Sequence, residues 1–166
     1  MANTLEAAGA VRQKTLAYNL NSVDRKALQG FFHYWATNKG NADLNFVAYS
    51  NSTVASDTNT GGCCTSTGWT PLAAAATVYV WYAKNDGTGD GTNAYMGLFN
   101  DTNNNSVANL YASGLISDDN DEFLFISPVG IAFGTDLTIS SCSTSTASGT
   151  SSASANAANG FVIVAA

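Results

Sequence analysis

The chain has 166 residues, of which 11% are charged, and its formal net charge is −6. This length is typical of a single domain that buries a hydrophobic core without needing disulfides or a metal ion. The charged fraction lies well below the ~25% of an ordinary soluble protein. It argues against a freely soluble enzyme and favours a protein that is packed among neighbours. The sequence also contains no Gly-x-Ser-x-Gly elbow, phosphate loop or His-rich motif, so no catalytic residues and no cofactor are predicted.

The charge is unevenly distributed along the chain. Residues 1–39 carry five Lys or Arg against two carboxylates, a balance of +3, and residues 40–166 carry one Lys against ten carboxylates, a balance of −9. The asymmetry predicts that the first segment meets an acidic partner surface, such as the body of a neighbouring copy, although a solvated helix face would show the same pattern. Five cations without a stripe of aromatic residues are too few to predict nucleic-acid binding. The residues predicted to bind the partner are Arg12, Lys14, Arg25 and Lys26.

Residues 1–40 are predicted as an N-terminal arm and helical segment, and residues 41–166 as a β-sandwich domain. The stretch 4–18 tolerates a helix, but Gly9 interrupts it, so an extended arm that orders only against a partner is an equal alternative. Because this stretch is basic and lies outside the strand pattern, residues 1 to about 20 are expected to anchor the protein. Their deletion is expected to leave the sandwich intact.

A second helix is predicted over residues 22–40. Ser22 is its expected N-cap, Asp24 lies in the first turn, where the helix dipole favours a carboxylate, and Gly40 is the expected stop. A glycine in the middle of this segment leaves a strand over residues 30–36 as the alternative.

Apolar residues at spacings of three and four predict the buried face of this second helix. They are Ala27, Leu28, Phe31, Phe32 and Trp35. His33 stands among these residues, so it is expected to be a core or interface histidine rather than a general base.

From residue 43 onward the apolar residues alternate, which predicts β-strands. Strands are expected at 43–49, 73–84, 94–99 and 107–112. The second and third of these are predicted to form a hairpin with a long tip.

Three apolar runs in the last third of the chain, within residues 121–139 and 160–166, are predicted as consecutive strands of one antiparallel sheet. Pro128 and Gly130 are expected to separate the first run from the second. The segment 140–160 consists almost entirely of Ala, Ser, Thr, Gly and Asn, so a long exposed loop is expected there. Alternation predicts these core positions: Phe123, Phe125, Ile131, Phe133, Leu137, Ile139, Phe161 and Ile163.

Seven or eight short strands with turn residues between them predict a mainly β fold. The expected architecture is a jelly-roll-like antiparallel β-sandwich with an N-terminal arm and one or two short helices.

Two groups of acidic residues are candidate cation sites. Asp86 and Asp90 match the first half of a calcium loop, but Gly97 stands where the bidentate glutamate should be, and a hairpin turn explains the same residues. The carboxylates at 118, 119, 121 and 122 are the second candidate, together with Asp101, and a solvated turn before a strand is the alternative. No metal site is predicted.

The three cysteines lack the spacing of metal ligands. Cys63 and Cys64 are adjacent and Cys142 stands alone, so all three are expected to be reduced or non-essential. No basic region followed by an apolar run opens the chain, and no stretch approaches ~18 apolar residues. Export and a membrane span are therefore not expected.

Several features together resemble the small virion proteins of tailed phages. They are the Ala, Ser, Thr and Asn-rich composition with few charges, the N-terminal arm, the segment Phe-Leu-Phe-Ile-Ser-Pro-Val-Gly-Ile-Ala-Phe-Gly-Thr-Asp-Leu at 123–137, and the terminal Val-Ile-Val strand. The resemblance covers residues 77–139 and 160–166, and it is strongest to capsid decoration (cement) proteins, which often form trimers on the shell.

The resemblance implies a structural virion protein, assembled in the host cytoplasm, that binds the outer capsid surface and reinforces it. The implied partners are the major capsid protein and further copies of the chain itself, with a trimer as the first expectation, and no nucleic acid or membrane. A receptor- or glycan-binding module of a phage fibre or adhesin is the alternative, in which Trp69, Trp81 or Tyr82 would stack on sugars. Such a module would show an exposed aromatic pair, whereas decoration predicts exposed apolar patches near the termini.

Overall fold

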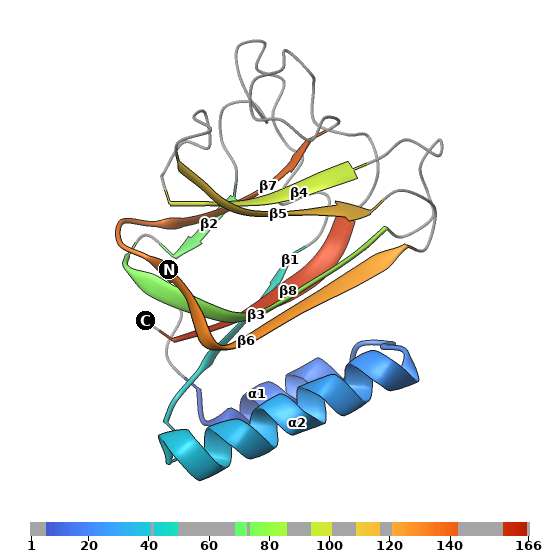
Figure 1. Cartoon of the computed structure of the whole chain (residues 1–166), viewed down its shortest axis with the longest axis vertical. Coiled ribbons are helices and arrows are strands. Elements are labelled where there is room, and N and C mark those ends of the chain that lie inside the picture. The colour runs from blue at the N-terminus through green and yellow to red at the C-terminus, as the bar shows by residue number, and fades with distance from the viewer. Residues whose placement is uncertain are drawn as a thin grey trace.

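The computed structural model describes residues 6–40, 42–49, 69–72, 74–85, 94–100, 109–116, 121–142 and 158–165. These residues form two helices and two four-stranded antiparallel sheets, which confirms the predicted mainly β fold. Figure 1 shows three layers, with the second sheet stacked above the first and the helices below it. In chain order the elements are α1 (Ala8–Leu16), α2 (Ser22–Lys39), β1 (Asn45–Tyr49), β2 (Trp69–Leu72), β3 (Ala76–Asn85), β4 (Ala94–Phe99), β5 (Leu110–Ile116), β6 (Glu122–Phe133), β7 (Leu137–Cys142) and β8 (Ala158–Ala165).

The strand order is that of a jelly roll. One sheet has the order β1-β8-β3-β6 and the other has the order β2-β7-β4-β5. Strands from the two halves of the chain pair in a nested series, β1 with β8, β2 with β7, β3 with β6 and β4 with β5. This nesting is what results when one long hairpin of eight strands folds over into two facing sheets.

Two strand pairings expected from chain order are wrong. β3 and β4 do not form a hairpin, because β3 pairs with β6 and β8 while β4 pairs with β5 and β7. The three C-terminal runs do not share one sheet either, because the second run begins in β6 of the first sheet and continues into β7 of the second sheet. In a jelly roll the chain passes from one sheet to the other at most connections, so strands that are neighbours in sequence are seldom neighbours in a sheet.

β8 is buried on both of its faces. Val162 and Val164 point into the core between the two sheets, and Phe161 and Ile163 point into a second core between the first sheet and the helices. The continuous apolar run in this strand is typical of strands covered on both sides. All eight core positions predicted from alternation lie in or against one of these two cores. Phe161 and Ile163 belong to the core between the first sheet and the helices, and the other six belong to the core between the two sheets.

The predicted break between two strands at Pro128 and Gly130 is instead a bulge within one long strand, β6. The register with β3 shifts between Val78 and Val80, opposite the bulged residues of β6. Gly130 has a φ of 73°, and its amide donates a hydrogen bond of 3.0 Å to Ser127 Oγ. A proline that donates no ladder hydrogen bond and a glycine with positive φ are both suited to such a bulge.

α2 begins and ends close to the predicted residues. Asn21, rather than Ser22, is the N-cap, because the Asp24 amide donates to Asn21 Oδ1 at 2.8 Å. Asp24 lies in the first turn and Gly40 ends the helix in the left-handed conformation, as predicted. The alternative strand over residues 30–36 is wrong. The apolar stripe decides in favour of the helix, because it is buried against the first sheet.

The buried face of α2 consists of Leu28, Phe31, Phe32 and Trp35. Ala27 is exposed, which corrects its assignment to this face. His33 is also exposed, so of its two predicted roles the core histidine is wrong and the interface histidine stays a prediction. The reason is geometric, because successive helical residues point about 100° apart and His33 therefore diverges from the buried side of its neighbour.

α1 is a helix and not an extended arm, and it belongs to the fold. Glu6 forms an antiparallel bridge with Leu44, and Val11 is fully buried in the core between helices and sheet. Tyr18 packs on the ring of Phe161, with the ring centroids 4.9 Å apart. The expectation that residues 1–20 contribute little to the fold is therefore wrong for residues 6–20.

Candidate partner-binding surface

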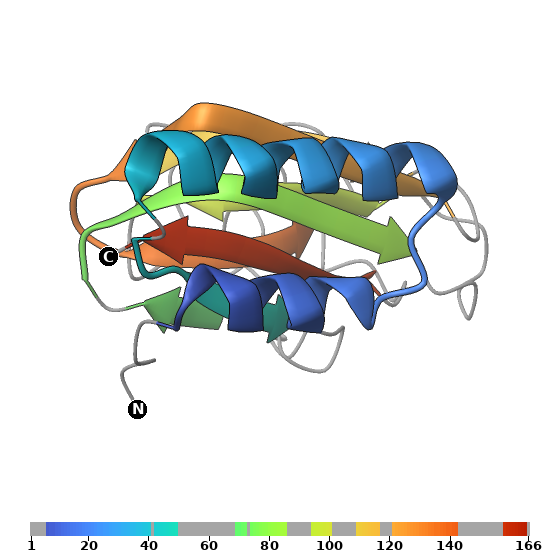
Figure 2. The ribbon, with the colours of Figure 1, turned by 90° about the horizontal axis from the view of Figure 1, so that it is seen from below.

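The outer surface of the helical layer brings together most of the residues predicted to bind a partner. Figure 2 shows α1 and α2 side by side beneath the first sheet, with α1 near β1 and β8 and α2 near β3 and β6. The helices run antiparallel, so the start of α1 lies beside the second half of α2. One side of each helix is buried against the sheet, and the other side faces outward.

A groove of about 340 Å³, the α1–α2 groove, lies between the two helices. Its α2 wall consists of residues spaced by three and four, which places them on one side of that helix. Arg12 supplies a positive charge at its α1 wall, and all the lining residues are Ala8, Gly9, Arg12, Gln29, Phe32, His33 and Ala36.

A second hollow adjoins the groove at the start of α2. It is lined by Leu20, Ser22, Arg25, Lys26 and Gln29. Gln29 borders both hollows, so the two form one continuous strip along the helix pair. We call this strip the basic seam, and its charged residues are Arg12, Arg25 and Lys26. Three of the four cations predicted from the sequence therefore lie together, although they come from different helices.

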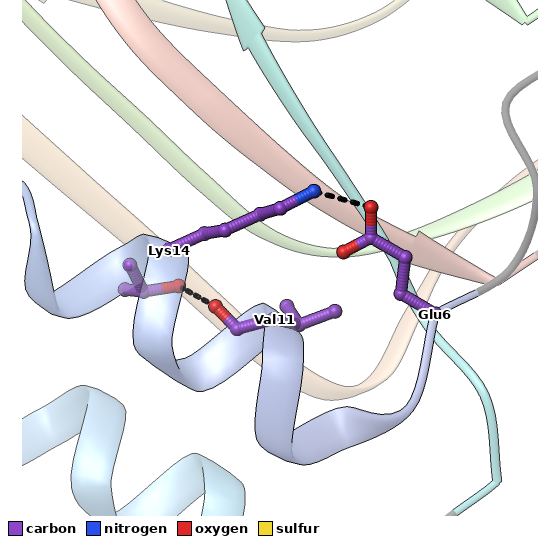
Figure 3. Close-up of polar contacts among 4 residues, drawn as sticks. Glu6, Val11 and Lys14 are labelled. Atoms are coloured by element: carbon purple, nitrogen blue, oxygen red, sulfur yellow. Dashed lines mark hydrogen bonds and ion pairs between the residues drawn. The ribbon is translucent and has the colours of Figure 1, made fainter.

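Lys14, the fourth predicted cation, does not join the basic seam. Figure 3 shows its ammonium group directed at the carboxylate of Glu6, with which it forms an ion pair. The next residue, Thr15, is buried, and its hydroxyl donates a hydrogen bond of 2.9 Å to the carbonyl oxygen of Val11. Lys14 thus ties α1 to the segment that precedes it, and its charge is already compensated.

The cations of the basic seam carry no such compensation within the described residues. Lys14 with Glu6 is the ion pair found there, and Arg12, Arg25 and Lys26 pair with no described carboxylate. Arg25 Nη2 makes one long hydrogen bond, of 3.4 Å, to the carbonyl oxygen of Leu20. Because all three side chains are exposed, their charges are hydrated in the free chain and available to a partner.

A polar cluster joins the start of α2 to the start of β6. The Asn21 side-chain amide donates to Asp24 Oδ2 at 3.0 Å and also to Glu122 Oε1, and the Tyr82 hydroxyl donates to Glu122 Oε2 at 2.6 Å. Partial burial and the charge of Glu122 raise the pKa of Asp24, and the Asn21 hydrogen bond opposes them. The cluster anchors α2 to the sheet.

Glu122, a member of the second candidate cation group, is thus occupied by Tyr82 and Asn21. Asp121 directly precedes β6, and residues 101, 118 and 119 lie outside the described part of the chain. Across the residues that are described, no three His, Cys, Asp or Glu side chains gather as metal ligands.

Several other predicted residues cannot be placed. Cys63, Cys64 and the calcium-loop candidates Asp86 and Asp90 lie outside the described residues. Cys142 is the last residue of β7, and its side chain is not among those described.

The aromatic residues suggested as sugar platforms are mostly inaccessible. Trp81 and Tyr82 each expose 2% of their surface, because they occupy the central strand β3 between the two cores. Trp69 begins β2, and its side chain is not described. Among the described aromatic residues, Tyr34 and Tyr111 are exposed. The ring of Tyr111 stacks on that of Phe133, so one of its faces is already covered.

Comparison with protein-family models, with curated proteins and with solved structures finds no match to this chain. Neither described helix is long and apolar enough to cross a membrane. The strand topology and the chemistry of the basic seam are therefore the features of the described residues that indicate a function.

Among the uncharged residues of the site, sequence reasoning named His33 as a core or interface residue and missed Gln29. Gln29 and His33 border the groove because α1 packs beside the outward face of α2. Their helical spacing was visible in the sequence, but nothing in the sequence indicated that Arg12 of α1 would lie next to them.

Proposed function

We propose that this chain is a structural protein of a phage virion that binds the outer surface of the capsid and reinforces it. The nested jelly-roll strand order carries this proposal. Double-sheet jelly rolls are the architecture of many viral capsid and lectin domains. The step from fold to function is an analogy between folds, so it needs a direct test.

Two further observations support a role in an assembly. Only 11% of the residues are charged, which suits a surface that is packed among neighbours. The three cations of the basic seam pair with no carboxylate of the described residues, which suits attachment to an acidic surface. Because a shell presents many copies of each site, modest individual contacts are sufficient when bound copies also touch one another. We propose that the copies associate with each other, as a trimer.

A glycan-binding module of a fibre or adhesin is the second candidate, because lectins also use the jelly roll. The burial of Trp81 and Tyr82 argues against it, since neither ring can stack on a sugar. Trp69 is the suggested platform that stays open to test.

Co-sedimentation with empty capsids of the same phage tests the proposal. Purified protein is mixed with shells that lack it, and the bound amount is measured over a concentration series. We expect saturable binding at a fixed ratio to the major capsid protein and a higher disassembly temperature of the loaded shells. Binding that does not saturate, or loaded shells that disassemble like bare ones, would reject the proposal. Light scattering at micromolar concentration tests self-association, and a monomeric mass would reject the trimer.

A further inference from the structure

The α1–α2 groove contains an opening that the folded chain itself does not need. Gly9 lies inside α1, and a Cβ atom added there would meet no atom within 4 Å. Glycine is much less favourable than alanine inside a helix, because it loses more backbone freedom on folding. Since no contact with the described residues requires a glycine here, the space above Gly9 is room for a group from outside.

The basic seam has the length of a short extended peptide. From Ser22 to Ala36 along α2 it covers roughly 21 Å, at a rise of 1.5 Å per residue. An extended segment of about six residues spans that length at ~3.3 Å per residue. The chain thus offers a linear track that is bordered by two helices.

The cations lie at two points along this track. Arg25 and Lys26 are at one end, and Arg12 lies near His33, about 12 Å further along α2 by the helical rise. In an extended segment, side chains four residues apart point the same way and are separated by ~13 Å. Two carboxylates at that spacing would meet both cationic points, and the residue beyond them would lie over Gly9 and the edge of Phe32.

The charge of the seam favours a protein carboxylate over nucleic acid. Three cations are few for a phosphate backbone, and the remainder of the chain is strongly acidic, which repels a long polyanion. The described lining also contains no exposed Phe, Tyr or Trp ring on which bases would stack, since Phe32 is only 8% exposed.

We propose that the α1–α2 groove and the basic seam bind an extended acidic segment of another protein, with carboxylates four residues apart. This rests on the proposed function in one respect, namely that the segment belongs to the major capsid protein. Arg12 and the pair Arg25 and Lys26 each receive one carboxylate. Gly9 leaves the clearance that lets the backbone of the segment settle between the helices.

Two matched pairs of variants test the proposal in the capsid assay. Arg12→Glu is compared with Lys39→Glu, which makes the same change in net charge outside the seam. Gly9→Leu is compared with Gly30→Leu, because Gly30 is also a helical glycine with open space at its Cβ, but it lines a different notch beside Tyr34 and Pro128. Thermal melting confirms that each variant is folded, and both leucine variants are expected to melt no lower than the parent.

We expect Arg12→Glu and Gly9→Leu to weaken capsid binding by roughly fivefold or more, and the two control variants to stay within about twofold. Binding by the parent chain should weaken with added salt more steeply than binding by Arg12→Glu, because one screened charge contact is missing in the variant. If the parent binds capsids and all four variants bind equally well, the proposed groove is wrong while the proposed function stands.

A peptide probe tests the groove without capsids. The acetylated, amidated peptide Glu-Ser-Ala-Ser-Glu is titrated into ¹⁵N-labelled protein and compared with its Gln-Ser-Ala-Ser-Gln counterpart. The proposal predicts amide shifts at Gly9, Gln29 and His33 with the Glu peptide alone, and their loss in Arg12→Glu. Absence of shifts, equal shifts with both peptides, or tighter binding of a single-stranded oligonucleotide at the same amides would overturn it. Failure of the parent chain to bind capsids, with the peptide shifts present, would reject the proposed function and retain the acidic-segment site.

Discussion

The indole N–H of Trp81 donates a hydrogen bond of 3.0 Å to the hydroxyl of Tyr49, although the strands that carry them are not neighbours. β8 lies between β1 and β3, and its residue Gly160 is in register with Tyr49 on one side and with Ala83 on the other. The Tyr49 side chain reaches over Gly160, and its hydroxyl donates at 2.6 Å to the carbonyl oxygen of Tyr82. This bridge joins three strands of the first sheet.

Replacing Tyr49 by Phe should destabilise the fold. The substitution keeps the ring but leaves the buried Trp81 N–H without this acceptor, and such a buried group costs about 1–3 kcal/mol. We expect the free energy of unfolding, measured in urea, to fall by that amount. Tyr34→Phe is the matched control, because Tyr34 is 37% exposed, and it should change stability by less than about 0.5 kcal/mol. Equal stabilities of the two variants would show that the bridge contributes nothing.

Alkaline pH should weaken the fold through the same tyrosine. Burial raises the pKa of Tyr49, an effect that its hydrogen bond with Trp81 opposes only in part. The contribution of the Tyr49 hydroxyl to stability is complete below the pKa of ~10 that a tyrosine has in the unfolded chain, and it is lost as the pH rises above that value. The reason is that the unfolded chain then releases a proton that the folded chain keeps.

For one such tyrosine, the free energy of unfolding falls by at most ~1.4 kcal/mol per pH unit. We expect the stability advantage of the parent chain over Tyr49→Phe to shrink above pH ~10 and to be constant between pH ~7 and ~9. Urea unfolding of both proteins across this pH range measures the difference. The raised pKa values of Tyr18 and Tyr82 affect both proteins, so they cancel in the comparison.

Gly160→Ala should be more damaging than any ordinary surface change. A Cβ atom at this position would overlap the Tyr82 carbonyl oxygen and the Tyr49 hydroxyl, and the first of these is backbone in a central strand that cannot move aside. We expect a loss of about 3 kcal/mol or more in the free energy of unfolding, as for severe overpacking. Gly134→Ala, whose Cβ would meet no atom within 4 Å, should be close to neutral. Thermal melting that does not distinguish the two variants would contradict this prediction.

A chain that starts at Asn21 should melt well below the full chain. The deletion removes Val11 and Leu20, which are 0% and 5% exposed, and it uncovers Phe161 by removing Tyr18. Burial of two such aliphatic side chains alone contributes roughly 3–6 kcal/mol, so the melting temperature should fall by about 10 °C or more.

Deletion of residues 1–5 alone is the control for this truncation. It leaves the bridge between Glu6 and Leu44 and the whole of α1 in place. We expect this shorter deletion to melt within about 3 °C of the full chain. Equal melting of the chain that starts at Asn21 would show that α1 is dispensable, contrary to its burial.

Strand positions and buried faces followed from local pattern. β4 was predicted at its observed residues, and Phe133, Leu137 and Ile139 were assigned to a core from alternation alone. The stop of α2 at Gly40 was predicted as well, because a left-handed glycine is a local signal. The core alternative for His33 was wrong because aromatic neighbours in sequence do not all share one side of a helix.

The sequence by itself determined most of the strands, the second helix and most of the residues that avoid water, because side-chain periodicity is a property of each segment alone. Only the tertiary structure decided which strands pair and where the cations meet. The alternation within one strand does not specify which other strand pairs with it, so the pairing of β1 with β8 and of β3 with β6 could not be inferred from chain order. For the same reason Lys14 and Arg12 were both predicted to bind the partner. The packing of α1 instead directs Lys14 to Glu6 and leaves Arg12 in the groove with His33.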